Sequence, residues 1–232
     1  MKRFYQEVTS GEAEGGYEVR LDGKPIKSPA GHALLVPTPG LAAALAEEWA
    51  AQGDTVVPAS MPLMQLVSTA LDRMPLTRTQ VTGYVAGFGG SDVLCYRAES
   101  PSDLVVLQAV RWQPWLDWAE KEFGARLAVT AGVVPVVQDA ESLAVLRQRI
   151  EECDDWTLTA LQSLAPCLGS LVLSLAVVAG AVTAEEAFAL SRLDESFQAE
   201  RWGSDAEAAA RTAGLRQEVL AAARLLELVT TN

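Results

Sequence analysis

The amino-acid sequence predicts an α+β protein in which a small N-terminal two-layer α/β domain is followed by a larger C-terminal helical domain. Apolar and charged residues alternate near the N-terminus, which is typical of strands with one buried face. From residue 77 onward, helix-start signals recur instead. The chain has 232 residues, half of them apolar, which is enough for one or two hydrophobic cores. We therefore expect domains over residues 1–76 and 77–232.

The first predicted elements are strands joined by tight turns. Apolar and charged side chains alternate over residues 17–22, so this segment is expected to be a strand. The Asp22-Gly23 pair provides a turn, because glycine tolerates a positive φ, and residues 24–27 are expected to return as the second strand of a hairpin. A second turn and a further apolar run follow over residues 29–36.

Two helices are expected to complete the first domain. Thr38 resembles an N-cap, and Pro39 suits the first helical position, so a helix is predicted to run from there to Gln52. A second helix is predicted over residues 61–74 and is expected to end before Pro75. Strands on one side and these helices on the other give a two-layer α/β unit.

The second domain is predicted to be mainly helical. A hydroxyl followed three residues later by a carboxylate or amide can satisfy the free amides of a first helical turn, and this spacing occurs at Thr77/Gln80, Thr183/Glu186 and Ser204/Glu207. Ser100 followed by Pro101 suggests another start. Helices are expected over residues 101–123, 141–152, 155–164, 168–178, 184–201 and 205–229.

The charge balance excludes two classes of partner. Eighteen basic and thirty acidic residues give a net charge of −12, and no basic cluster is present, so binding to nucleic acid or to an anionic membrane surface is not expected. Residues 168–182 carry no charge, but fifteen residues are too few to cross a membrane. We interpret this segment as a buried helix and expect no membrane insertion.

Residues that carry catalysis or bind metals are scarce. The three cysteines lack the C-x-x-C spacing of a metal site, and the one histidine has no second imidazole to complete a metal site or a catalytic triad. Phosphate-binding glycine motifs are also absent from the sequence. We therefore predict no catalytic residues, no metal and no cofactor, and a protein that is not an enzyme.

Two aromatic features remain to be explained. Trp112, Trp115 and Trp118 follow one another at steps of three, so a helix would bring them close together, either in the core or on a partner-binding surface. In the segment 191–203, Glu195 and Trp202 lie on one helical stripe next to a predicted helix-helix corner. A carboxylate beside an exposed aromatic suits recognition of another protein, whereas the alternative is a set of weak surface ion pairs.

Several runs of residues, spread over almost the whole chain, form a recognisable set. They are Thr69-Ala70-Leu71-Asp72-Arg73, Asp92-Val93-Leu94-Cys95-Tyr96-Arg97, Gln108 with Trp112, Pro114 and Trp118, and Ser191-Arg192-Leu193-Asp194-Glu195 through Gln198, Trp202 and Gly203. Together they resemble the ATP-twelve family, whose members are assembly chaperones for the F(1) sector of ATP synthase. The resemblance implies a chaperone that binds the unassembled α subunit of F(1) and prevents its aggregation before a β subunit replaces the chaperone.

The resemblance also implies where the partner binds. A glutamate before the Trp-Gly pair is important in the family, and Glu195 is its nearest match here; the expected partner-binding residues are Asp194, Glu195, Gln198, Glu200, Trp202 and Asp205. After Trp202-Gly203 the chain departs from mitochondrial members, which continue with aromatic and histidine residues. We expect a monomer in the bacterial cytoplasm, or in the mitochondrial matrix for a mature eukaryotic form. The competing hypothesis is a carboxylate-dependent enzyme at the same corner, from Asp194 to Asp205.

Overall fold

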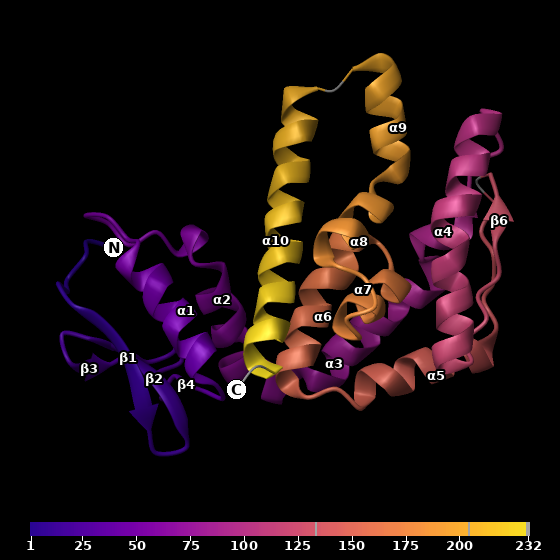
Figure 1. Ribbon diagram of the computed structural model, residues 1–232. Coiled ribbons are helices and arrows are strands. Elements are labelled where there is room, and N and C mark those ends of the chain that lie inside the picture. The colour runs from indigo at the N-terminus through magenta and orange to yellow at the C-terminus, as the bar shows by residue number, and fades with distance from the viewer. Residues whose placement is uncertain (133, 204, 231–232) are drawn as a thin grey trace. The chain divides into compact units, whose positions relative to one another are not determined.

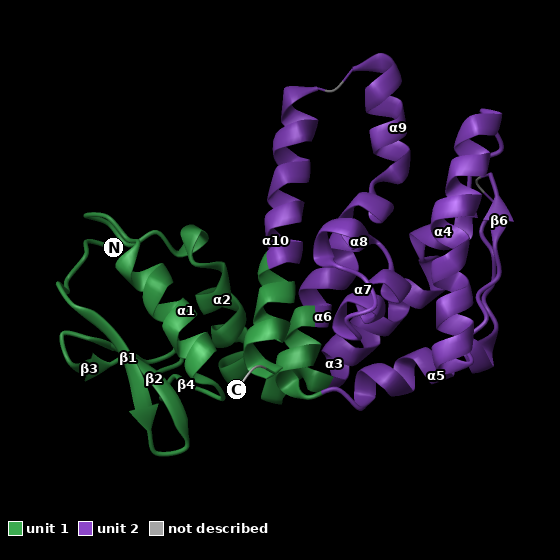
Figure 2. Cartoon of the chain, in the orientation of Figure 1, with its two compact units in different colours: residues 1–78, 154–160, 221–232 green, residues 79–153, 161–220 purple. Residues whose placement is uncertain are grey.

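The computed structural model describes residues 1–132, 134–203 and 205–230 and confirms the predicted α+β class (Figure 1). The chain forms two compact units (Figure 2). Unit 1 comprises Met1–Arg78, Asp154–Ala160 and Ala221–Asn232, and unit 2 comprises Thr79–Cys153 and Leu161–Leu220. The units therefore differ from two consecutive domains divided after residue 76, because the chain returns twice to unit 1.

The sheet of unit 1 is antiparallel. Its strands are β1 (Val8–Ala13), β2 (Gly16–Leu21), β3 (Lys24–Pro25) and β4 (Leu35–Val36), and β2 pairs with each of the others. The predicted hairpin at Asp22-Gly23 is confirmed by the pairing of Leu21 with Lys24. Strand β1 was not predicted, because its side chains are all exposed or half-buried and show no apolar alternation.

Helix α1 (Pro39–Ala50) covers the sheet and begins as predicted, with the Thr38 hydroxyl accepting a hydrogen bond from the Leu41 amide at 3.1 Å. Its buried face includes Leu41 and Leu45 and packs into one core with Val19 of β2. The same core includes Leu225 of α10 (Ala206–Thr230) and, at its edge, Trp156 of α6 (Asp155–Leu168). These apolar contacts explain why parts of two later helices belong to unit 1.

The predicted helix end at Pro75 is wrong. Helix α2 (Pro62–Ser68) continues through a π-helical turn, η2 (Thr69–Arg73), into α3 (Met74–Gly87) without a break. The Met74 amide bonds the Thr69 carbonyl, five residues back. This wide turn immediately precedes Pro75, where an α turn would press the proline ring against the carbonyl four positions earlier.

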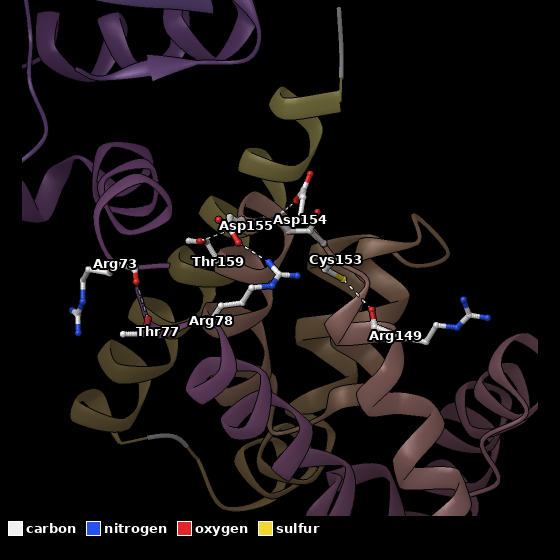
Figure 3. Close-up of polar contacts among 9 residues, drawn as sticks. Arg73, Thr77, Arg78, Arg149, Cys153, Asp154, Asp155 and Thr159 are labelled. Atoms are coloured by element: carbon white, nitrogen blue, oxygen red, sulfur yellow. Dashed lines mark hydrogen bonds and ion pairs between the residues drawn. The ribbon is translucent and has the colours of Figure 1, made fainter. Parts of the chain in front are cut away.

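The predicted helix start at Thr77 is also wrong, because Thr77 lies inside α3. Its hydroxyl donates to the Arg73 carbonyl at 2.9 Å, as Figure 3 shows. One residue later, the Arg78 guanidinium donates to the Asp155 carboxylate at 2.5 Å. This ion pair is a second reason why the segment Asp154–Ala160 belongs with the N-terminal residues.

Unit 2 is built from helices and one short pair of parallel strands. The strands are β5 (Tyr96–Arg97) and β6 (Thr130–Ala131). Among the described residues, the helices that lie wholly within this unit include α4 (Ser102–Phe123), α5 (Ala140–Glu151), α7 (Leu171–Val178) and α8 (Ala184–Ser191). Short 3-10 turns occur at Pro58–Ser60 in unit 1 and at Phe88–Ser91 and Val93–Cys95 in unit 2.

Several predicted boundaries of unit 2 can be compared with the structure. The Thr183 cap is confirmed, because its hydroxyl accepts from the Glu186 amide at 3.2 Å. The Ser100 cap is wrong by one position, because Pro101 precedes the first turn of α4. The predicted helix over residues 184–201 is divided at Arg192, after which α9 (Leu193–Trp202) begins. The expected Ser204 cap lies outside the described residues.

The charge-free segment over residues 168–182 contains the core helix α7. Each of its residues from Leu171 to Val177 is buried. No helix in the described ranges 1–132, 134–203 and 205–230 combines the length and the hydropathy needed to cross a membrane.

Candidate functional site

The predicted helix-helix corner contains a groove between α9 and the first half of α10, here called the α9–α10 groove. Residues of both helices line it, and Figure 1 shows the two helices running next to each other in the chain's C-terminal part. The groove has a volume of about 560 Å³. Four of the six predicted site residues line it, namely Glu195, Gln198, Trp202 and Asp205.

The lining of the groove is mostly small and apolar. Helix α10 contributes Ala208, Ala209 and Ala213, and α9 contributes Ala199 together with Trp202. The Trp202 residue is 75% exposed, which is unusual for so large an aromatic. An exposed indole beside a row of methyl groups offers apolar surface to a partner.

Charged side chains form the rim of the groove. The Glu195 carboxylate accepts from Arg192 at 3.0 Å and remains exposed. Arg192 is itself held in place, because its other terminal nitrogen donates to the Cys167 carbonyl at 2.6 Å. Asp205 lies at the start of α10, where its carboxylate accepts from the Ala208 amide at 3.3 Å. Arg216 of α10 also lines the groove and pairs with Glu185, so the rim combines two carboxylates with two guanidinium groups.

Asp194 does not line the groove, although it is the neighbour of Glu195. Its carboxylate accepts from the Gln108 side-chain amide of α4 at 2.7 Å. The carbonyl oxygen of that same side chain accepts from the Ala98 amide at 2.7 Å, so Gln108 is fully buried between two partners. Burial raises the pKa of Asp194. The geometry gives Asp194 the role of attaching α9 to α4.

Glu200 also lies outside the groove lining. It is exposed near the end of α9. Its neighbour Arg201 stacks over the Phe197 ring of the same helix at 4.2 Å and forms an ion pair with Asp103 of α4. The structure thus brings together four of the predicted site residues and separates two from them.

The competing enzyme hypothesis requires a carboxyl with a raised pKa in a pocket. The two aspartates whose pKa is raised, Asp92 and Asp194, do not line the groove. Burial raises the pKa of Asp92 to about 6, and its carboxylate caps α7 by accepting from the Val172 amide and the Ser170 hydroxyl, each at 2.9 Å. Within the part of the chain that the structure describes, no group of three or more His, Cys, Asp or Glu side chains could hold a metal ion.

The structure decides the role of Trp112. It is fully buried, and its indole nitrogen donates to the Leu190 carbonyl of α8 at 2.9 Å. Trp115 and Trp118 are half-buried and meet edge to face, with ring centroids 6.4 Å apart. Trp112 therefore belongs to the core, while its two neighbours cover the outer side of the same helix.

A second groove, in unit 1, was missed by the sequence analysis. It has a volume of about 800 Å³, and Thr69, Asp72 and Arg73 contribute to its lining. The run Thr69–Arg73 resembled the ATP-twelve family but lacked a chemical pattern of its own. The signal that could have drawn attention to it is the neighbouring Pro75, which suggests an irregular turn inside a helix.

The fold and the α9–α10 groove define a class: a two-unit α+β protein with an exposed apolar surface suited to binding another protein. Comparison with known proteins identifies the family. The family model described as "ATP12 chaperone protein" matches residues 2–120, just over half of the chain. The chain therefore belongs to the ATP12 chaperone family.

Individual relatives agree with this assignment. The crystal structure of Atp12 from Paracoccus denitrificans is 41% identical, with a TM-score of 0.92 over 98% of both chains. A protein from Agrobacterium tumefaciens is 40% identical, with a TM-score of 0.92 over 99% of this chain and 86% of that one. Protein atp12, mitochondrial, from Schizosaccharomyces pombe is 27% identical over 215 residues, which cover 88% of this chain and 74% of that protein.

Proposed function

We propose that this chain is an assembly chaperone of ATP synthase that binds the unassembled α subunit of the F(1) sector through the α9–α10 groove. Membership of the ATP12 chaperone family and the 41% identity to a bacterial Atp12 support the chaperone role. The observation that carries the choice of surface is the exposed Trp202, which lines the groove together with small side chains of α10.

Release of the client also has a physical basis in this groove. An unassembled subunit exposes apolar surface that would otherwise promote aggregation, so a chaperone must cover part of that surface and later give it up. A groove of about 560 Å³ covers only a few side chains of such a surface. A contact of this limited extent is one that a β subunit with a larger interface can displace.

Charge gives the groove a preference among client segments. Glu195 and Asp205 at its rim are balanced by Arg192 and Arg216, but the whole chain carries a net charge of −12. A basic segment of the client is therefore attracted, and two copies of the chaperone repel each other. We expect a monomer that acts where F(1) is assembled, in the bacterial cytoplasm or in the mitochondrial matrix.

The test is co-purification of the tagged chain with separately expressed α and β subunits of F(1). We expect selective capture of α, and loss of most of that capture in Glu195→Lys and in Trp202→Ala. Glu200→Lys is the matched control, because it makes the same charge change on the same helix outside the groove lining. Each variant is first compared with the wild type by circular dichroism.

The outcomes separate function from site. Capture of α that survives in both groove variants would keep the chaperone function and contradict the α9–α10 groove as its site. Capture of neither subunit by the folded wild type would contradict the function itself. In an accompanying assay, an equimolar amount of the chain is expected to suppress aggregation of free α subunit.

A further inference from the structure

The groove of unit 1, here called the N-terminal groove, has the properties of a binding surface in its own right. Its volume is about 800 Å³, and its lining is mostly apolar, with Trp49, Val56, Met61 and Met64 among the contributing residues. Methionine side chains are flexible and polarisable, so they adapt to apolar groups of different shape. Such a lining suits a ligand whose apolar side chains vary.

One wall of the groove is held in place by Asp72. Its carboxylate accepts from the Ser28 hydroxyl at 2.6 Å and from the Ala30 amide at 3.0 Å, and it lies 2.9 Å from Nδ1 of His32. These bonds hold the pKa of Asp72 below its usual range. The carboxylate therefore serves to fasten the loop around residues 28–32 to the π-helical turn η2, and its charge is largely satisfied.

Two cationic side chains at the groove, unlike Asp72, have no partner of opposite charge among the described residues. Lys27 and Arg73 both line it, and neither has an ion-pair partner among the residues that the structure describes. Arg78, by contrast, pairs with Asp155 only five residues further along the chain. Thr77 bonds only the main-chain carbonyl of Arg73, as Figure 3 shows. Two free cations in a strongly acidic chain point to an anionic partner.

We propose that the N-terminal groove is a second docking surface, which takes an extended peptide segment with alternating apolar and acidic side chains. In an extended peptide, successive side chains point to opposite sides, so the apolar set can enter the groove while the carboxylates stay at its open side, where the exposed Lys27 and Arg73 attract them. A polypeptide is the ligand class that a member of a chaperone family meets. This surface goes beyond the α9–α10 groove, because it lies in the other unit and carries two cations without an ion-pair partner among the described residues.

The test uses fluorescence anisotropy of a fluorescein-labelled peptide of alternating leucine and glutamate, titrated with the full chain. A second peptide has lysine in place of each glutamate. We expect the glutamate peptide to bind, and the Lys27→Ala/Arg73→Ala double variant to weaken its binding about tenfold, through the loss of two partly exposed ion pairs. Lys24→Ala is the control, since this exposed lysine of unit 1 does not line the groove.

A second variant tests the apolar part. Met64→Glu places a charge in the groove and is expected to abolish binding of the glutamate peptide, while Glu200→Lys, which lies outside both groove linings, is expected to leave it unchanged. Equal affinity of the double variant and the wild type would overturn the proposal, as would equal affinity for the two peptides. Tight binding of sodium octanoate in place of the peptide would reassign the groove to a small amphipathic anion.

Discussion

Substitution of two adjacent carboxylates, Asp194 and Glu195, is expected to impair different properties of the chain. Adjacent residues of a helix point about 100° apart, so one carboxylate can face the interior while the next faces the solvent. Asp194 is bonded to the buried Gln108, whereas Glu195 lies at the rim of the α9–α10 groove. Asp194→Ala is therefore predicted to reduce stability, and Glu195→Lys to reduce client capture.

The size of the stability loss follows from the hydrogen bond that disappears. Asp194→Ala leaves the side-chain amide of Gln108, which is fully buried, without its acceptor. A buried donor left unpaired costs about 1–3 kcal/mol, so the free energy of unfolding should fall by about 2 kcal/mol. For a chain of this length that corresponds to a Tm lower by about 6 °C. The exposed Glu195–Arg192 pair contributes less than about 1 kcal/mol.

The assay is urea unfolding followed by circular dichroism, together with thermal melts, for the wild type, Asp194→Ala, Asp194→Asn and Glu195→Lys. Asp194→Asn keeps one oxygen that can accept from Gln108, so it should recover most of the loss. An Asp194→Ala variant as stable as the wild type would refute the reasoning. A Glu195→Lys variant that loses more stability than Asp194→Ala would refute it equally.

Two further predictions concern buried polar groups of unit 2. Trp112→Phe should lose about 2 kcal/mol of unfolding free energy in urea, because it removes the bond to the Leu190 carbonyl and leaves a cavity. Trp118→Phe, at a half-buried position, should lose less than about 1 kcal/mol. Equal losses would contradict a core role for Trp112 alone. The pKa of Asp92 is about 6 in the folded chain and near 4 in the unfolded chain, so ionisation of this group removes stability as the pH rises through this window. Relative to Asp92→Asn, the wild type should lose about 2 kcal/mol of unfolding free energy between pH 4 and pH 7, and a constant difference would contradict this.

The fold could be predicted where local signals decide the structure. The alternation over residues 17–22 correctly predicted β2, and the Thr38 and Thr183 caps correctly predicted where two helices begin. The same rules failed where packing overrides them. Pro75 is a local stop signal, yet a π-helical turn accommodates it and the helix continues. Nothing local indicates that Trp156 and Leu225 join the core of unit 1.

Only the part of the candidate site that lies on a single helix, α9, could be predicted from the sequence. Helical spacing placed Glu195 and Trp202 on one stripe, and both line the α9–α10 groove. The opposite wall comes from the alanines of α10, which have no functional signature in a sequence. Gln108 lies 86 residues before Asp194, so their bond depends on how α4 and α9 pack. Spacing along one helix therefore does not identify Asp194 as a structural residue.

The two grooves together restrict the kind of client segment that this chain can hold. The α9–α10 groove has both carboxylates and guanidiniums in its lining, whereas the N-terminal groove has two cations without an ion-pair partner among the described residues. On the two proposals made above, the grooves would therefore favour segments of different charge. A client that offered a segment to each groove would be held more firmly than through either contact alone, and each weak contact would be released separately.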